Sequence, residues 1–455
     1  MEGAHVLALP YPAQGHITPM LQLCKRLASK SVKVTLVIVS DKPSKPYRTQ
    51  HDITVVTIWN GFREGEEPLR DLDEYMDRVE RSISNHLPLL IDELKSSEFP
   101  PKSLVYDSSI PWVLDIAKSN GLYGAVLFTQ PWFVTVVYYH VRKGSFCVPS
   151  RRDDHPTLAS FPSLPLLSPS DLPSFLCESG SYPSLLEVVL NQLSNIEKAD
   201  LVLCNTFDKL EEKVMKWMEE NLWPVKNIGP TVPSLYLDKR LPGDKDYGLS
   251  LFNPKVDECL TWLDTKEPNS VVYVSFGSLV VLKDEHMHEL AAGLKQTGHS
   301  FLWVVRETET DKLPRNYLQE VSEKGLVVTW SPQLQVLAHK SVGCFVTHCG
   351  WNSTLEAMSL GVPMIGMPHW TDQPTNAKFI EDVWKVGVRV KADRDGFVRR
   401  EEIERCVGEI MEGVKGQEIR RSVDKWKDFA REAVSEGGSS DRNIDVLVDK
   451  FCQMK

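Results

Sequence analysis

The sequence predicts an α/β protein built from two doubly wound domains with a cleft between them. Three observations lead to this prediction. The chain has 455 residues, which is too long for a single hydrophobic core. In both halves, short and almost continuously apolar segments alternate with segments of helical period, as in parallel sheets that helices cover on both faces. Between the halves, residues 230–254 are rich in proline, glycine and charge, as expected of an interdomain linker.

In the first half, a strand is expected at residues 5–10, and a loop follows it. A helix should begin at Thr18 with Pro19 in its first position, because threonine caps helices and proline fits their first turn. One face of this helix is apolar and consists of Met20, Leu23, Cys24 and Leu27. Further strands of the same sheet are expected at residues 32–39 and 103–107.

The second half repeats this alternation. Apolar runs predict strands at 270–278, 301–306, 325–330, 343–348 and 362–368. Two helices have apolar faces, which consist of Met287, Leu290, Ala291 and Leu294, and of Ile403, Cys406, Val407 and Ile410. Ser353 and Glu356 have the S-x-x-E spacing of a capping box, which predicts a helix that begins at Ser353. We therefore expect domains at 1–235 and 255–435, a linker at 236–254 and a last segment at 436–455.

Composition excludes several classes of partner. A net charge of −10 and a pI near 5.7 argue against a surface for nucleic acid or anionic membranes. Nine scattered cysteines without a C-x-x-C pair indicate reduced thiols in the cytoplasm and no metal site. We expect no signal peptide and no membrane span, because the first residues lack a basic region and no 18-residue apolar run occurs. We also expect a monomer.

Polar residues collect where the strands of the second half end. Gly277 and Ser278 end one strand, Trp330 ends another with Gln333 three residues later, and His348 ends a third. After the strand at 362–368 come His369, Trp370, Thr371, Asp372 and Gln373. Parallel strands place their carboxyl ends at one edge, where ligands bind in open sheets. A capping box explains Ser353 and Glu356 but none of the other loops, so this edge is a candidate ligand site.

The residues at this edge match the parts of a nucleotide sugar. The start of the helix at Ser353 offers free backbone N–H groups and a positive dipole end to phosphate. Trp330 offers a flat face on which a base can stack, worth about 1–3 kcal/mol. Glu356 can accept hydrogen bonds from two ribose hydroxyls, and Asp372 with Gln373 can bind the hydroxyls of a sugar.

Residues 330–373, WSPQLQVLAHKSVGCFVTHCGWNSTLEAMSLGVPMIGMPHWTDQ, resemble the 44-residue signature of plant secondary-product UDP-glycosyltransferases. The resemblance extends to GHITP at 15–19, VYVSFGS at 272–278 and EGGSSDRN at 436–443. It implies the GT-B fold of two Rossmann-like domains, with a C-terminal helix at 436–455 that crosses back to the first domain. It also implies UDP-glucose as the donor, and neither a cofactor nor a metal.

The resemblance implies a role for each donor residue. Trp330 would stack on uracil, Gln333 would bind the base and ribose, and Glu356 would take the ribose hydroxyls. The diphosphate would be held by Ser278, His348, Asn352, Ser353 and the backbone of Trp351. Asp372 and Gln373 would bind the sugar, and Gln373 with Trp351 favours glucose. Gly350 and Trp370 are also assigned to the donor site.

The first half holds a candidate catalytic pair. His16 is expected in the loop before the first helix, where the helix dipole should keep its imidazole neutral and able to accept a proton. Asp107 ends the strand at 103–107, where its carboxylate could orient the imidazole. An ordinary loop histidine and a turn aspartate are the alternatives, and the resemblance favours a base and its partner. A direct displacement would then invert the sugar and yield a β-glucoside. A serine hydrolase fits less well, because no G-x-S-x-G is present.

The acceptor is expected beside aromatic segments at 128–140 and 171–184, which suit a small lipophilic molecule. Candidate pocket residues are Phe133, Tyr182, Leu279 and Thr371. TVPSLYLDKR, YGLSLF and WTDQPTNAKF resemble a subgroup that acts on salicylate-like acids, phenolics, triterpenes and steroids. We expect a steroid, terpenoid or phenolic hydroxyl, with ester formation on a carboxylic acid as the alternative. Two other classes fit less well: an oxidoreductase, because G-x-G-x-x-G is missing at the start of both domains, and a catalytically silent sugar-nucleotide-binding protein, because His16 and Asp107 are present.

Overall fold

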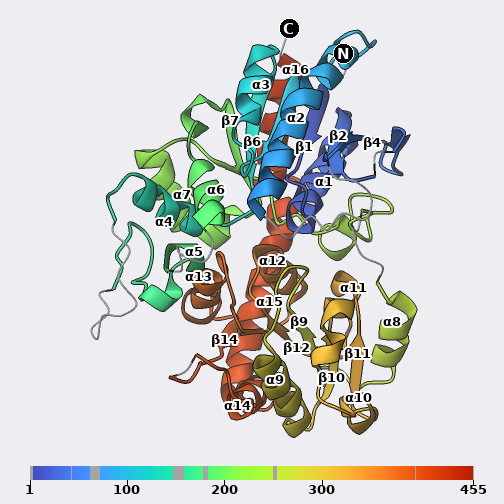
Figure 1. Cartoon of the computed structure of the whole chain (residues 1–455), viewed down its shortest axis with the longest axis vertical. Helices are drawn as coiled ribbons and strands as arrows, with labels where there is room; N and C mark the ends of the chain where they lie inside the picture. Colours follow the sequence, from blue (N-terminus) through green and yellow to red (C-terminus); the bar gives the residue numbers. More distant parts are fainter. Residues whose placement is uncertain are drawn as a thin grey trace.

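The computed structural model describes residues 4–42, 44–61, 72–146, 158–177, 183–249, 254–394 and 396–453. Two α/β domains are stacked along the long axis of the molecule (Figure 1). Within these residues, the first domain contains an eight-stranded sheet in the order β3-β4-β2-β1-β5-β6-β7-β8, which is parallel apart from the pair β3–β4. Its strands are β1 (His5–Leu9), β2 (Lys33–Ser40), β3 (Tyr47–Arg48), β4 (Thr54–Trp59), β5 (Ser103–Asp107), β6 (Tyr123–Phe128), β7 (Leu201–Cys204) and β8 (Lys226–Asn227).

The second domain contains a parallel sheet in the order β11-β10-β9-β12-β13-β14. Its strands are β9 (Val271–Ser275), β10 (Ser300–Val304), β11 (Gly325–Val328), β12 (Val342–Thr347), β13 (Met364–Gly366) and β14 (Gly387–Arg389). The five strands expected from the apolar runs are all present, with ends that move by up to three residues. The predicted fold class of two doubly wound domains is confirmed.

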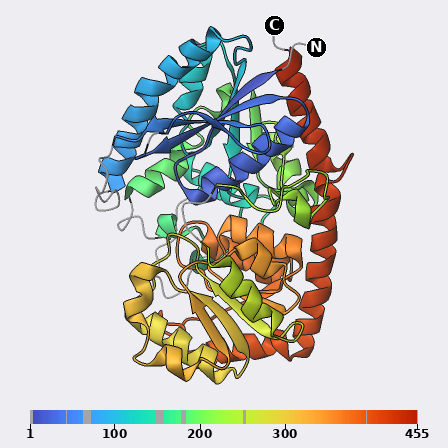
Figure 2. The ribbon, with the colours of Figure 1, turned by 90° about the vertical axis from the view of Figure 1, so that its right-hand side faces the viewer.

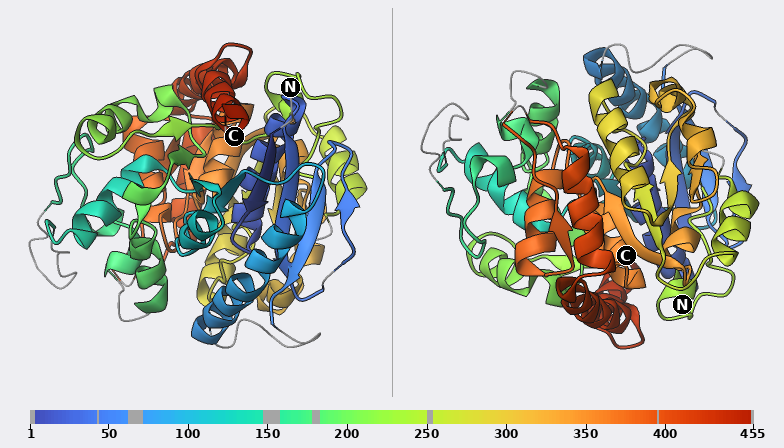
Figure 3. Two further views of the ribbon diagram at one scale, coloured as in Figure 1. Left: turned by 90° about the horizontal axis from the view of Figure 1, so that it is seen from above. Right: turned by 90° about the horizontal axis from the view of Figure 1, so that it is seen from below.

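Helices flank the strands of both sheets when the molecule is seen from above and from below (Figure 3). In the first domain they are α1 (Gln14–Ser29), α2 (Leu72–Lys95), α3 (Val113–Ser119), α4 (Trp132–Arg142), α5 (Ser174–Cys177), α6 (Pro183–Asn191) and α7 (Asp208–Asn221). The later helices are α8 (Val256–Asp264), α9 (Asp284–Gln296), α10 (Tyr317–Glu320), α11 (Gln333–Leu337), α12 (Trp351–Leu360), α13 (Gln373–Lys378), α14 (Arg400–Met411), α15 (Val414–Val434) and α16 (Ser439–Gln453). The apolar faces predicted for α1, α9 and α14 are buried. Among the described helices, none combines the length and the apolar character needed to cross a membrane.

Two helices begin earlier than the sequence suggested. Helix α1 starts at Gln14 rather than Thr18, because Ala13 has an extended backbone and its carbonyl accepts the N–H groups of His16 (2.9 Å) and Ile17 (3.0 Å). Helix α12 starts at Trp351, with Gly350 as its N-cap. Ser353 is therefore the third helical residue, and the prediction that it caps the helix is wrong.

The end of the chain returns to the first domain. Helix α15 belongs to the second domain, and α16 packs against α1 and β8 of the first (Figure 2). Ser440 Oγ donates a hydrogen bond to the carbonyl of Gly229 (2.5 Å), and the ring of Phe451 packs edge-on against Tyr123. The last helix thus joins the two domains independently of the linker.

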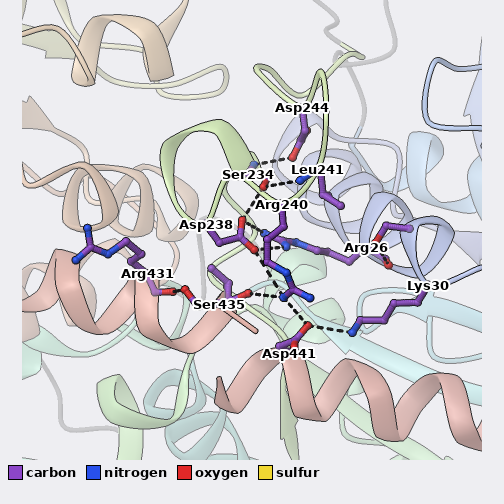
Figure 4. A network of polar contacts seen from close by, with 12 residues as sticks. Arg26, Lys30, Ser234, Asp238, Arg240, Leu241, Asp244, Arg431, Ser435 and Asp441 are labelled. Carbon is purple, nitrogen blue, oxygen red and sulfur yellow. Dashed lines mark hydrogen bonds and ion pairs between the residues drawn. The ribbon is translucent and has the colours of Figure 1, made fainter. Parts of the chain in front are cut away.

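Charged residues tie the linker to α1 and α16 (Figure 4). Arg26 of α1 forms two hydrogen bonds to Asp238, of 2.6 and 2.9 Å. Arg240 and Lys30 both contact Asp441 of α16 at 3.0 Å. These contacts hold the start of the linker against the helix that begins with Gln14, Gly15 and His16.

Candidate active site

Both sheets reverse their strand order at the point where the candidate residues lie. In the first sheet the order reverses between β1 and β5, and His16 and Asp107 follow or end these two strands. In the second sheet it reverses between β9 and β12, which precede the Gly277–Ser278 turn and His348. Such reversals open a crevice beyond the carboxyl ends of the strands, where ligands bind in open α/β sheets.

A hydrogen bond across the domain interface joins the two crevices. Asn352 Nδ2, near the start of α12, donates to the carbonyl of Gly15 in the first turn of α1 (2.7 Å). That carbonyl would normally accept the N–H of the residue four positions later, which here is Pro19 and has none. The proline therefore leaves the Gly15 carbonyl available to the other domain, next to His16.

The predicted catalytic pair is assembled. His16 Nδ1 lies 2.8 Å from Asp107 Oδ2, and Thr129 Oγ1 lies 3.1 Å from the same nitrogen. Asp107 is fully buried, and its Oδ1 accepts the N–H of Ser109 (2.9 Å), which fixes the carboxylate. With Nδ1–H directed at Asp107, the lone pair of His16 lies on Nε2, which none of the described residues engages. The His16 side chain is 28% exposed, so a substrate can reach it.

The pKa of His16 is raised above its ordinary value of 6.5. Burial acts to lower this pKa, but the charge and hydrogen bond of Asp107 and the charge of Asp372 together outweigh it. The expectation of a neutral imidazole considered only the helix dipole, whereas the two carboxylates act on this pKa in the opposite direction. Asp372, whose charge acts on His16, belongs to the second domain.

A chain of hydrogen bonds joins the residues that are predicted to bind the nucleoside. Gln333 Nε2 donates to Ser353 Oγ (3.0 Å) and to Glu356 Oε2 (2.6 Å). Tyr273 donates to the other end of the same amide, Gln333 Oε1 (3.1 Å). Burial raises the pKa of Glu356, while the hydrogen bonds from Gln333 and Tyr247 act to lower it. Ser353 and Glu356, the residues of the S-x-x-E spacing, thus both bind Gln333 and do not form a capping box.

The start of α12 and His348, which are predicted to hold the diphosphate, lie next to each other. Thr354 is the first residue of α12 whose N–H bonds back into the turn, to the Gly350 carbonyl (2.9 Å), so the preceding amides are free for a ligand. His348 lies between two glycines: a Cβ at Gly277 would come within 2.9 Å of its ring, and one at Gly350 within 2.4 Å of Nε2. Burial lowers the pKa of His348 to about 4 against the opposing hydrogen bond to the Ser275 backbone, so the neutral ring has a single N–H to donate and carries no charge.

The loop after β13 places the predicted sugar-binding residues. Asp372 is held by Thr371 Oγ1 (2.8 Å) and Asn376 Nδ2 (2.7 Å), and burial raises its pKa. Gln373 Oε1 accepts the backbone N–H groups of His369 (2.9 Å) and Trp370 (3.1 Å). The amide of Gln373 therefore shapes the loop with its oxygen, which leaves its NH₂ group available to donate.

Two predicted residues have buried rings. Trp351 is buried, and its Nε1 donates to the carbonyl of Asn205 (2.7 Å). Phe133 is fully buried and stacks on Phe379 with 3.7 Å between ring centroids, so it offers no surface to an acceptor here. Both rings belong to the packed interface between the domains, which explains why an aromatic segment alone does not identify a pocket.

The other predicted residues differ in exposure and in contacts. Leu279 is 53% exposed, and Arg306 donates to the carbonyl of its neighbour Ser278 (2.7 Å). Thr371 exchanges hydrogen bonds with Ser174 of the first domain. Trp330 is half-buried at the end of β11. Tyr182 lies outside the described residues.

Sequence reasoning missed two residues at the interface. Asn205 follows β7, donates to Asn352 Oδ1 (3.3 Å) and binds Trp351 through its carbonyl. The rule that singled out the other loops would have found it, had the strand at Leu201–Cys204 been recognised. Tyr247 donates to Glu356 from within the linker (2.6 Å); it begins the segment YGLSLF, but nothing in that segment indicated a contact with Glu356. No group of three His, Cys, Asp or Glu side chains suited to a metal occurs in the described part of the chain.

Comparison with known proteins yields consistent matches. The family described as "UDP-glucoronosyl and UDP-glucosyl transferase" matches residues 212–414. UDP-glycosyltransferase 74E2 of Arabidopsis thaliana is 70% identical over 99% of this chain and 100% of its own, and Mogroside I-E synthase of Siraitia grosvenorii is 48% identical over 98% of both. The structure of Os79 from O. sativa in complex with UDP has a TM-score of 0.91 and 38% identity, and covers 98% of this chain and 100% of that one.

Proposed function

Because this chain belongs to the family of plant UDP-glycosyltransferases, which transfer sugar from a UDP-sugar to small molecules, we propose that it is an inverting O-glucosyltransferase with His16 as its base. The observation that carries this proposal is the interdomain contact of α1 and α12. His16 and its partner Asp107 come from the first domain, and the free amides of α12 come from the second. The bond from Asn352 to Gly15, next to His16, brings the base and the anion site together.

The first half of the reaction is removal of a proton from the acceptor. His16 Nε2 takes the hydroxyl proton while Nδ1–H stays bonded to Asp107, whose charge stabilises the imidazolium that forms. The raised pKa of His16 makes it a stronger base than an ordinary histidine. A positioned base of this kind contributes about 10²–10⁴-fold to the rate.

The second half is displacement at the sugar. The acceptor oxygen forms a bond to the anomeric carbon, and the bond from that carbon to the β-phosphate oxygen breaks with its electron pair on UDP. We propose that the N-terminus of α12 and neutral His348 stabilise the charge on the leaving diphosphate, without a metal. A single displacement on an α-linked donor gives a β-glucoside.

We propose a lipophilic hydroxyl compound of the terpenoid, steroid or phenolic type as the acceptor. The family includes a relative that is 48% identical and is named for a mogroside product. A solved structure of Os79, with a TM-score of 0.85 and 37% identity over 98% of this chain, holds a trichothecene. These names favour bulky alcohols, and the exposed face of His16 is where such a hydroxyl would arrive.

The test is a transfer assay with UDP-glucose and a panel of phenols, aromatic acids, triterpenes and steroids, with products read by mass spectrometry. His16→Ala should abolish product from hydroxyl acceptors, and NMR of the wild-type product should show a β-linked glucose. His288→Ala is the matched control, because that histidine lies exposed on α9, outside the site.

The outcomes separate the alternatives. Undiminished product in His16→Ala would contradict the base role and point to a carboxylic acid acceptor, which is already ionised. An α-linked product would contradict the single displacement. UDP-glucose binding without product from any acceptor of the panel would favour a silent binding protein.

A further inference from the structure

The linker tyrosine Tyr247 reaches the carboxylate to which ribose binding is assigned. Its hydroxyl donates to Glu356 Oε1 at 2.6 Å, and Gln333 Nε2 donates to the other oxygen, Oε2, at 2.6 Å. Glu356 is buried, and these two hydrogen bonds hold one oxygen each. Burial beside Glu356 raises the pKa of Tyr247, which keeps the phenol protonated and able to donate.

Helix α1 holds the backbone on both sides of Tyr247. Lys25 Nζ donates to the carbonyl of Asp246 (2.8 Å), immediately before the tyrosine, and Gln14 Nε2 donates to the carbonyl of Leu249 (3.2 Å). Lys25 also forms a buried ion pair with Asp244 (2.8 Å). The position of Tyr247 is therefore set by the first domain, although its hydroxyl acts in the second.

The hydrogen-bonding capacity of Glu356 leaves room for a ligand. A carboxylate has about four acceptor sites, two on each oxygen. Tyr247 and Gln333 use one site on each oxygen, so each oxygen keeps one site for a neighbouring hydroxyl. We propose that Tyr247 is a positioning residue of the donor site, which orients Glu356 so that its two oxygens receive the 2′- and 3′-hydroxyls of the UDP ribose.

This inference rests on the proposed function, since it assumes that Glu356 binds ribose. The experiment compares UDP with 2′,3′-dideoxyuridine 5′-diphosphate by isothermal titration calorimetry on the full chain. Tyr247→Phe removes the hydroxyl and keeps the ring. We expect it to weaken UDP binding about tenfold and binding of the dideoxy analogue less than about twofold, because the analogue has no hydroxyl for Glu356 to receive.

Tyr236→Phe is the matched control, because Tyr236 is a half-buried tyrosine of the same segment without a hydrogen bond to Glu356. It should leave both affinities unchanged. Equal weakening of both ligands by Tyr247→Phe would indicate a general structural role and overturn the inference, as would no weakening of UDP. If the wild-type protein itself fails to prefer UDP over the analogue, ribose recognition by Glu356 fails, and the inference fails with it.

Discussion

Removing Asp244 should destabilise the first domain more than removing any exposed acid, because its partner is a buried lysine. Lys25 Nζ contacts Asp244 Oδ1 at 2.8 Å, and the two side chains are 3% and 0% exposed. Asp244→Ala leaves the ammonium with the Asp246 carbonyl but no counter-charge, and leaves the Ser234 N–H without its carboxylate partner. Breaking one side of a buried ion pair costs about 3–5 kcal/mol. For a domain of this size, that lowers the first thermal transition by about 6–20 °C.

Circular dichroism melts and urea denaturation measure the effect, and a second substitution tests its cause. Adding Lys25→Met to Asp244→Ala removes the uncompensated charge, so the double variant should be more stable than Asp244→Ala, although it loses two hydrogen bonds, those of the Ser234 N–H and of the Asp246 carbonyl. Glu220→Ala is the control: its ion pair with Lys216 is 3.9 Å long and exposed, so its loss should cost less than about 1 kcal/mol. A double variant no more stable than Asp244→Ala would refute the buried-charge explanation.

Four further predictions concern the site. The value of kcat/KM should fall on acidification with an apparent pKa above 6.5, because the pKa of His16 is raised and its neutral form is the base. Asp107→Asn should move this fall to lower pH and reduce the maximal kcat/KM at higher pH by about 10²-fold or more. Gly350→Ala should weaken UDP binding at least about tenfold by displacing His348, whereas Gly408→Ala on α14, where a Cβ meets no atom within 4 Å, should leave it unchanged; equal affinities in calorimetry would contradict this. Pro19→Ala supplies an N–H that competes with Asn352 for the Gly15 carbonyl, so kcat/KM should fall by about two- to tenfold while thermal stability is kept or raised. An unchanged kcat/KM would mean that the hydrogen bond from Asn352 to Gly15 does not contribute to catalysis. Dialysis against EDTA should leave transfer unchanged, because α12 and His348 are placed to stabilise the charge of the leaving diphosphate; a loss that Mg²⁺ restores would contradict this.

Local patterns of the sequence were sufficient for the elements and for the edge that holds the ligand site. The apolar spacing of Met287, Leu290 and Leu294 follows from the period of a single helix with one buried face. The continuous apolar runs at β9 and β12 are typical of strands that are buried on both faces. Because parallel strands end at a common edge, the residues after them could be grouped without coordinates. The starts of α1 and α12 could not be predicted from cap residues. Ala13 and Gly350 are the N-caps, without a side-chain hydrogen bond, and both helices begin before the expected caps Thr18 and Ser353.

The tertiary structure decided which distant residues meet. His16 and Asp107 are 91 positions apart, and they meet because β1 and β5 are neighbours where the strand order reverses. Gly15 and Asn352 are 337 positions apart, and their bond exists because Pro19 leaves a carbonyl free at the domain interface. Helical and strand periods describe which face of one element is buried, whereas these contacts depend on how elements pack. For the same reason, the sequence alone could not show that Phe133 is buried between the domains or that Tyr247 reaches Glu356.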